Sequence, residues 1–162
     1  MATPAEKIAA SIAKLSQYQI SRFFQQQVPL TQQECNSEAE RITGVSSIRP
    51  TAVQGGNSYT VIAGTKVVQF RETVQDLQLL KCCEEVYAGF TPQYESAGKL
   101  GNAHIYVMND VGGISMYLAR GQLPENNCEL LQKTLQEYAR LVNSLIYFPN
   151  RTENVKLNCA AY

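Results

Sequence analysis

Hydrophobic residues near the start of the chain recur at the spacing of an α-helix. Ile8, Ile12 and Leu15 lie three or four positions apart, and the pattern continues loosely to Phe24. Pro29 then ends it, because proline has no N–H group to donate within a helix. The pattern predicts a first amphipathic helix that ends before Pro29.

A second helix is marked by residues that are typical of helix ends. Thr31 suits the N-cap position, and Glu34, three residues later, completes a capping box. Gly44 follows the last residue of the helical pattern and suits the left-handed conformation of a C-terminal stop. We therefore expect a helix between Thr31 and Gly44.

β-Branched and aromatic residues replace the helical pattern from Val45 onward. The segments VSSIRPTAVQ, SYTVIAG and KVVQFR are separated by turns at Gly55-Gly56 and Gly64-Thr65. They predict three short antiparallel strands.

The rest of the chain predicts a helix, two strands and another helix. Apolar residues from Val74 to Tyr87 predict a helix of about four turns that crosses the sheet. Two strands follow, the second from His104 to Met108, and Gly112-Gly113 ends them. The last helix is long and amphipathic, with one face made of Leu130, Leu131, Leu135, Tyr138, Leu141, Val142 and Leu145.

These elements together predict an α+β fold. Its antiparallel sheet has about five strands, with a crossing helix, two N-terminal helices and a long C-terminal helix. We expect residues 1–149 to form a single domain and residues 150–162 to form a polar C-terminal tail.

Composition and charge exclude several classes of protein. Lys plus Arg and Asp plus Glu both number 14, and no basic run occurs, so neither nucleic acid nor a membrane is an expected partner. No segment has the apolar length of a membrane span or of a signal peptide. The five cysteines include no CxxC motif and fit neither a zinc site nor a disulfide framework. We expect free thiols, no metal site and a cytoplasmic location.

Three segments resemble a known family when they are taken in order. VQGGNSYTVIAGTKVVQFR, EEVYAGFTPQYESAGKLG and HIYVMNDVGG are similar to segments of the fungal branch of the aminoglycoside phosphotransferase and choline kinase-like family. The resemblance runs from about Leu30 to Leu145, most of the chain. It implies a protein-kinase-like fold, of which this chain holds the N-lobe: three strands, one helix, two strands, a glycine-bearing connector and a helix.

The resemblance also implies a ligand-binding surface. The residues that it places over nucleotide phosphates are Gln54, Gly55, Gly56, Asn57 and Ser58. It implies that Arg71 reaches the same phosphates and that Gln78 replaces the family's glutamate partner of that cation. The resemblance also implies a hinge, whose backbone would contact the edge of an adenine ring. Its residues are Val107, Met108, Asn109 and Asp110. The glycines also suit a plain hairpin turn, and Arg71 suits a half-exposed strand position.

The catalytic lobe of that family is missing from this sequence. Phosphate transfer in the family depends on a His-x-Asp loop and on a later Asp that holds Mg²⁺. His104 is the only histidine, and the pattern places it in a strand. We therefore expect no phosphotransferase activity. ATP with Mg²⁺ is implied as a cofactor by the resemblance, and the residues themselves point to none.

Three functions stay open at this point. The first is a small-molecule or nucleotide-binding protein of fungal secondary metabolism, built on a truncated kinase-like lobe. The second is a small biosynthetic enzyme, an isomerase or cyclase that needs no ATP. Its candidate acid–base residues are His104, Arg71, Tyr59, Tyr106, Glu72 and Asp110. The third is a fragment of a longer phosphotransferase.

An apolar segment after the last strand predicts an interface. The residues that a second lobe would cover in a complete kinase are Val111, Ile114, Met116, Tyr117 and Leu118. We expect a homodimer with the helix from Cys128 to Phe148 at its interface, or a partner protein on the same surface. The alternative is a monomer in which that helix folds back onto the core.

Overall fold

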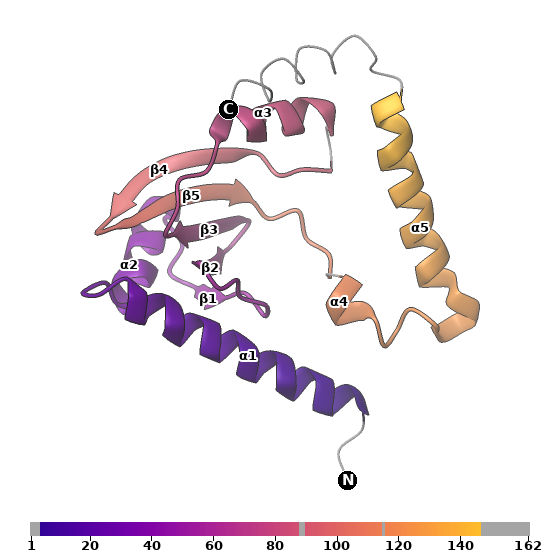
Figure 1. Cartoon of the computed structure of the whole chain (residues 1–162), viewed down its shortest axis with the longest axis horizontal. Helices are drawn as coiled ribbons and strands as arrows, with labels where there is room; N and C mark the ends of the chain where they lie inside the picture. Colours follow the sequence, from indigo (N-terminus) through magenta and orange to yellow (C-terminus); the bar gives the residue numbers. More distant parts are fainter. Residues whose placement is uncertain (1–3, 88–89, 115, 147–162) are drawn as a thin grey trace. The chain divides into compact units, whose positions relative to one another are not determined.

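The structure is a computed structural model that describes residues 4–87, 90–114 and 116–146. Its contacts divide the chain into two compact units, Met1–Leu77 with Gln93–Val111, and Gln78–Pro92 with Gly112–Tyr162. The first unit holds the sheet and the first two helices, and the other helices lie almost wholly in the second (Figure 1). A single domain over residues 1–149 stays a prediction.

The first unit contains a five-stranded antiparallel sheet. Its strands are β1 (Ile48–Pro50), β2 (Ser58–Ala63), β3 (Lys66–Arg71), β4 (Tyr94–Leu100) and β5 (Ala103–Asn109). They stand in the order β1-β2-β3-β5-β4, so β5 lies between β3 and β4 (Figure 1). The predicted α+β class and the antiparallel sheet of about five strands are confirmed.

The first strand is shorter than the sequence pattern predicts. Residues from Val45 to Gln54 read as one strand, yet only Ile48–Pro50 forms a regular ladder with β2, followed by one bond from the Thr51 N–H to the Thr60 carbonyl at 3.1 Å. Pro50 is the last residue of β1, and its missing N–H restricts it to an edge strand such as this one. The residues after Pro50 form a loop that leads to β2.

Two helices cover one face of the sheet, which we name the helix face. They are α1 (Pro4–Gln26) and α2 (Gln32–Thr43), as predicted. Alternate strand residues such as Tyr59, Val68 and Ile105 point to this face and are fully buried. Phe23 of α1 and Cys35 of α2 pack into the same core. Burial of these side chains is the main stabilising contribution to the first unit.

The ends of α2 have the geometry that the sequence predicts. Thr31 Oγ1 accepts from the Glu34 N–H at 3.2 Å, and Glu34 Oε2 accepts from the Thr31 N–H at 2.8 Å. Gly44 has a φ of 70°, and its N–H donates to the Glu40 carbonyl at 2.8 Å. The capping box and the glycine stop are therefore both confirmed.

The remaining strand residues point to the opposite side of the sheet, which we name the second face. Direct cross-strand neighbours point to the same side, so the pairing register defines the members of this face. One row across four strands is made of Ser58, Arg71, His104 and Lys99. The next row contains Thr60, Gln69 and Tyr106.

The helix after β3 is shorter than predicted. α3 (Leu77–Val86) has 10 residues, and none of them is buried. Val74 and Gln75 lie in the loop before it, where the Gln75 N–H donates to a tyrosine hydroxyl of the sheet instead of a helical carbonyl. The path of α3 across the sheet stays a prediction.

The second unit also contains α4 (Met116–Ala119) and the long α5 (Glu125–Ile146). Three residues inside α5, Asn126, Asn127 and Cys128, have left-handed φ angles of 48°, 55° and 62°, so the regular helix begins after Cys128. The predicted end at Phe148 and the tail of residues 150–162 lie outside the described residues. Among the described helices, none combines the length and the apolar character that crossing a bilayer requires.

Candidate functional site

The loop between β1 and β2 is closed by the side chain of Gln54. Its Nε2 donates to Thr51 Oγ1 at 2.9 Å and to the Thr60 carbonyl at 2.8 Å, and its Oε1 accepts from the Thr60 N–H at 3.0 Å. Both ends of the amide are therefore used within the loop. Gln54 is buried and shapes this loop.

The two glycines of the loop lie close to neighbouring side chains. A Cβ on Gly55 would lie 3.2 Å from Ser58 Oγ, and a Cβ on Gly56 would lie 3.2 Å from Gln19 Oε1 of α1. Within the described residues, the backbone N–H groups of Gly55, Gly56 and Asn57 make no hydrogen bond. Three successive N–H groups at one end of the sheet are thus available to an anion.

Beside this loop, four side chains of the second face form a row across the sheet. We name Ser58, Arg71, His104 and Lys99 the basic row, since they are direct neighbours on β2, β3, β5 and β4. Neighbouring strands lie about 4.8 Å apart, so the row spans roughly 14 Å. It brings together Ser58, Arg71 and His104, which the sequence analysis names for different reasons.

Neutral amides orient the guanidinium of Arg71. Its Nη1 donates to Gln69 Oε1 at 3.3 Å, and Gln69 Nε2 donates in turn to Thr60 Oγ1 at 3.2 Å. With the Gln75 amide turned so that its oxygen faces the guanidinium, this oxygen accepts from Arg71 Nε at 2.9 Å and from Nη2 at 3.2 Å. Since these bonds use three of the five N–H groups of an arginine, two remain for another acceptor.

Arg71, His104 and Lys99 form no ion pair in the part of the chain that the structure describes. The ion pairs found there lie within α2 and within α5. Glu72 follows Arg71 directly, but its side chain is exposed and makes no ion pair. Arg71 and Lys99 lie on either side of His104, so an anion bound near His104 would be attracted by both of their charges.

The two candidate tyrosines lie on opposite faces of the sheet. Tyr106 belongs to the second face, is 2% exposed, and accepts from the Gln75 N–H at 2.8 Å. Tyr59 is fully buried on the helix face, where its hydroxyl donates to Asn36 Oδ1 at 2.9 Å and accepts from Gln32 Nε2 at 3.0 Å. Burial raises the pKa of Tyr59 above its ordinary value. Only Tyr106 therefore shares a face with the basic row.

The predicted hinge residues occupy the end of a central strand. Val107 and Met108 lie in β5, and each has a paired neighbour on both β3 and β4, so the sheet encloses their backbone groups. Asn109 Oδ1 accepts from Lys66 Nζ at 2.8 Å, and the Asp110 N–H donates to a carbonyl of the β2–β3 turn at 2.9 Å. The backbone N–H and carbonyl groups of residues 107 and 108 are therefore not free to bind an adenine.

The residues of the site do not fit a magnesium ion. Mg²⁺ prefers carboxylate and other oxygen ligands, whereas the basic row supplies two cations, an imidazole and one hydroxyl. Over residues 4–87, 90–114 and 116–146, no group of three or more His, Cys, Asp or Glu side chains is arranged to hold a metal. Gln78 is exposed in the first turn of α3, in the second unit, and its pairing with Arg71 stays a prediction.

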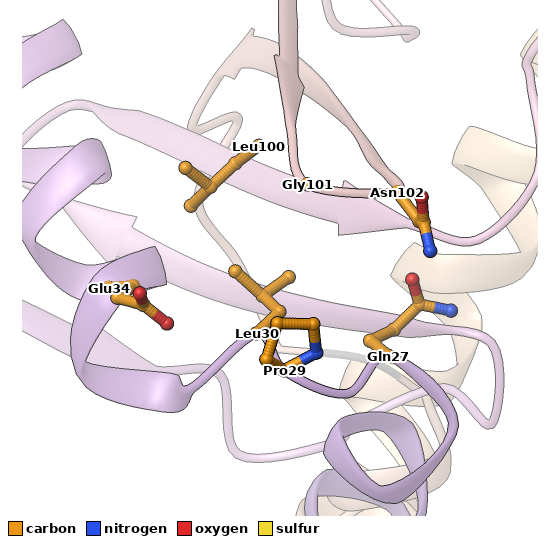
Figure 2. A pocket seen from close by; sticks show the side chains of 7 residues that line it. All are labelled: Gln27, Pro29, Leu30, Glu34, Leu100, Gly101 and Asn102. Carbon is orange, nitrogen blue, oxygen red and sulfur yellow. The ribbon is translucent and has the colours of Figure 1, made fainter.

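A separate pocket lies where the end of α1, the start of α2 and the β4–β5 hairpin meet (Figure 2). Its volume is about 160 Å³. The residues that line it are Gln27, Pro29, Leu30, Glu34, Leu100, Gly101 and Asn102. The sequence predicts a ligand-binding role for none of them, and it marks Pro29 and Glu34 only as signals of helix ends.

Some residues near the basic row were not predicted from the sequence, namely Gln69, Gln75 and Lys99. Gln69 precedes Arg71 by two positions, so strand periodicity could have placed both on one face. Lys99 becomes a neighbour of His104 only through the pairing of β4 with β5, which contains a register shift. Gly98, an isolated glycine inside β4, is the local signal that could have indicated this shift.

No family model, no curated protein and no solved structure matches this chain. The resemblance to the aminoglycoside phosphotransferase and choline kinase-like family stays a prediction.

Proposed function

We propose that this chain is a kinase N-lobe-like domain that binds a phosphate-bearing small molecule on the second face of its sheet and does not transfer the phosphate. The observation that carries the proposal is the basic row, in which Arg71, His104 and Lys99 stand on three adjacent strands. The loop before Ser58 adds backbone N–H groups, and Ser58 itself is buried beside Arg71.

The order of the elements supports the kinase-like part of this proposal. Three strands, a helix, two strands and a connector with Gly112 and Gly113 follow one another, as in the N-lobe of a protein kinase. The glycine loop before β2 and Arg71 at the end of β3 lie at the same end of the sheet. Backbone N–H groups beside a guanidinium suit the oxygens of a phosphate group.

The width of the basic row indicates the ligand that it fits. Arg71 and Lys99 are two strands apart, about 10 Å, with His104 between them. A single phosphate would contact Arg71 and His104, whereas a diphosphate would also reach Lys99, whose long side chain is exposed. We therefore infer a ligand with two phosphate groups, such as a nucleoside diphosphate.

The same arrangement favours binding over acid–base catalysis. A catalytic imidazole is commonly oriented by a second group, often a carboxylate. Both direct neighbours of His104 are cations, and no described carboxylate forms an ion pair with it. Tyr59, a candidate of the enzyme hypothesis, lies on the opposite face. The acid–base enzyme is therefore the less supported alternative.

Calorimetry of the full chain with pyrophosphate and with ADP, both without metal, tests the proposal. We expect saturable binding that weakens as salt is added, because the contacts are charged. Arg71→Ala should lower the affinity by about 1.5 to 3 kcal/mol, the range for a hydrogen bond to a charged group. The matched control is Arg49→Ala, since Arg49 is an exposed arginine of β1 outside the basic row.

Two outcomes would contradict the proposal. One is the absence of saturable binding for both ligands. The other is an equal loss of affinity in Arg71→Ala and in Arg49→Ala, which would indicate attraction by the overall charge of the surface. An unchanged affinity with a lower melting temperature in Arg71→Ala would assign Arg71 a structural role.

A further inference from the structure

Two buried side-chain oxygens of the first unit, those of Gln19 and Gln27, make no hydrogen bond among the described residues, and Gln27 lines the pocket of Figure 2. Gln27 follows the last residue of α1, and its side chain is 5% exposed. Its Oε1 is buried and makes no hydrogen bond within the described residues. Because a buried acceptor without a donor is destabilising, a donor placed in this pocket would stabilise the protein.

The pocket has polar ends and an apolar middle. Figure 2 shows the Gln27 amide pointing toward Asn102 at the tip of the β4–β5 hairpin, while Glu34 lies at the other end. Between these ends, the side chains of Leu30 and Leu100 face each other across the pocket. A ligand that fits would have an apolar stem and at least one N–H donor.

The charge of the lining favours a cation. Glu34 is the only titratable residue that lines the pocket. Hydrogen bonds from the side chain and the backbone of Thr31 hold the pKa of the Glu34 carboxyl below its usual range, so the group is ionised at neutral pH. Both bonds go to Glu34 Oε2, at 2.7 Å from Thr31 Oγ1 and 2.8 Å from Thr31 N. The carboxylate therefore keeps acceptor capacity on its other oxygen.

We propose that this pocket binds a small aliphatic primary amine. Its ammonium group donates to Gln27 Oε1, and its stem packs between Leu30 and Leu100. The Glu34 carboxylate, at the other end of the pocket, attracts the positive charge over the length of the stem. The pocket volume of about 160 Å³ is roughly five times the volume of one water molecule in the liquid, which suits a ligand of about five heavy atoms. The site lies apart from the basic row, so it does not depend on the proposed function.

Titration of the full chain with n-butylammonium chloride, followed by amide and side-chain NMR signals, tests the proposal. We expect saturable shifts at Gln27, Leu100 and Asn102 with a millimolar dissociation constant. The matched ligand is n-butyltrimethylammonium, which has the same charge and stem but no N–H donor. It should bind at least about fivefold more weakly, the loss expected for one hydrogen bond.

Two variants test the Gln27 acceptor and the Glu34 charge separately. Gln27→Leu removes the amide oxygen with little change in volume, and Glu34→Gln removes the charge while glutamine still completes a capping box. Gln27→Leu should weaken n-butylammonium binding about fivefold or more, the loss expected for one hydrogen bond. Glu34→Gln should weaken it by a smaller factor, about twofold, that decreases further as salt is added. Glu40→Gln is the control, because Glu40 is exposed on α2 and does not line the pocket. It should leave the affinity unchanged.

Three results would overturn the proposal. The first is the absence of a saturable shift at the lining residues, which would leave water as the occupant. The second is equal affinity for the two ammonium ligands. The third is unchanged affinity in Glu34→Gln, the variant that keeps the helix cap and therefore decides the test even if Gln27→Leu does not fold.

Discussion

Arg71 and His104 face each other across β3 and β5, and the Arg71 guanidinium turns toward the amide of Gln75 and not toward a carboxylate. A neutral partner fixes the direction of the guanidinium and leaves its charge unbalanced. A carboxylate in the same place would fix the direction and also cancel the charge. The amide of Gln75 therefore keeps the basic row attractive to an anion.

Replacing Gln75 by glutamate tests this relationship. The new carboxylate would accept from Arg71 where the amide oxygen now lies, 2.9 Å from Nε. We expect Gln75→Glu to weaken pyrophosphate binding by about tenfold, since it cancels the charge of one phosphate contact, and to leave the melting temperature unchanged or higher. Gln75→Leu removes the acceptor without adding charge and should cause a smaller loss. Equal losses in calorimetry would show that orientation alone matters.

The purified chain should neither hydrolyse ATP nor transfer phosphate to small alcohols or amines. His104 is the only histidine of the sequence, and it lies in β5 between two cations. No metal-ligating cluster occurs among the described residues. The measurement is ADP release in the presence of Mg²⁺. Release that follows the protein through purification and disappears in Arg71→Ala would contradict this prediction.

Removing the cap of α2 should destabilise the first unit. Thr31→Ala loses the acceptor of the Glu34 N–H and the donor to Glu34 Oε2, so we expect a loss of about 1 kcal/mol in the free energy of unfolding. Urea denaturation measures it. Thr31→Ser keeps the hydroxyl and should remain within a few tenths of a kcal/mol of the natural sequence. If Thr31→Ala and Thr31→Ser were equally stable, the cap would contribute nothing.

Stability should decrease in alkaline solution because of two buried groups. Burial, with a smaller contribution from the Glu34 charge, raises the pKa of the Cys35 thiol from 9.0 to about 12, and burial raises the pKa of Tyr59. A group whose pKa is higher in the folded state stabilises that state fully below the unfolded pKa. Its contribution is lost as the pH rises from about 9 toward 12, by about 1.4 kcal/mol per pH unit for one group.

Chemical denaturation at a series of pH values above 8 measures this effect. Cys35→Ala removes the thiol and should flatten the decrease above pH 9, whereas Cys82→Ala, in a half-buried position of α3, should not. A decrease of the same slope in Cys35→Ala and in the natural sequence would assign the alkaline loss to other groups.

The homodimer through α5 stays a prediction. The helix exposes apolar side chains that suit such an interface. Leu135 and Tyr138 are 57% and 64% exposed, and with Val142 they follow the three- and four-residue spacing of a helix–helix seam. We expect light scattering at micromolar concentration to give twice the mass of one chain and Leu135→Glu to give the single mass. Gln136→Glu, which adds the same charge outside the seam, should remain dimeric. A mass near 18.0 kDa that does not change on dilution would leave the dimer without support.

The sequence predicted most of the elements because their signals are local. The Thr31 and Glu34 capping box, the stop at Gly44 and the turn at Gly64 each depend on a few neighbouring residues. β1 and α3 came out shorter than predicted, because the Gln54 amide binds the backbone N–H and carbonyl of Thr60 and because the Gln75 N–H donates to Tyr106. Both deviations come from contacts that a local pattern does not contain.

The candidate site also combines features that the sequence predicted with features that only the tertiary structure decided. By itself, the sequence determined that Arg71 and His104 lie in strands and that Gly55 and Gly56 lie in a tight loop. Only the tertiary structure decided that these residues meet at one end of the sheet, that Lys99 joins them, that Tyr59 points to the other face, and that Gln27 faces a pocket. The physical reason is that strand register and helix docking follow from burying apolar side chains that are distant in sequence, and that burial fixes which polar groups remain together on the other side.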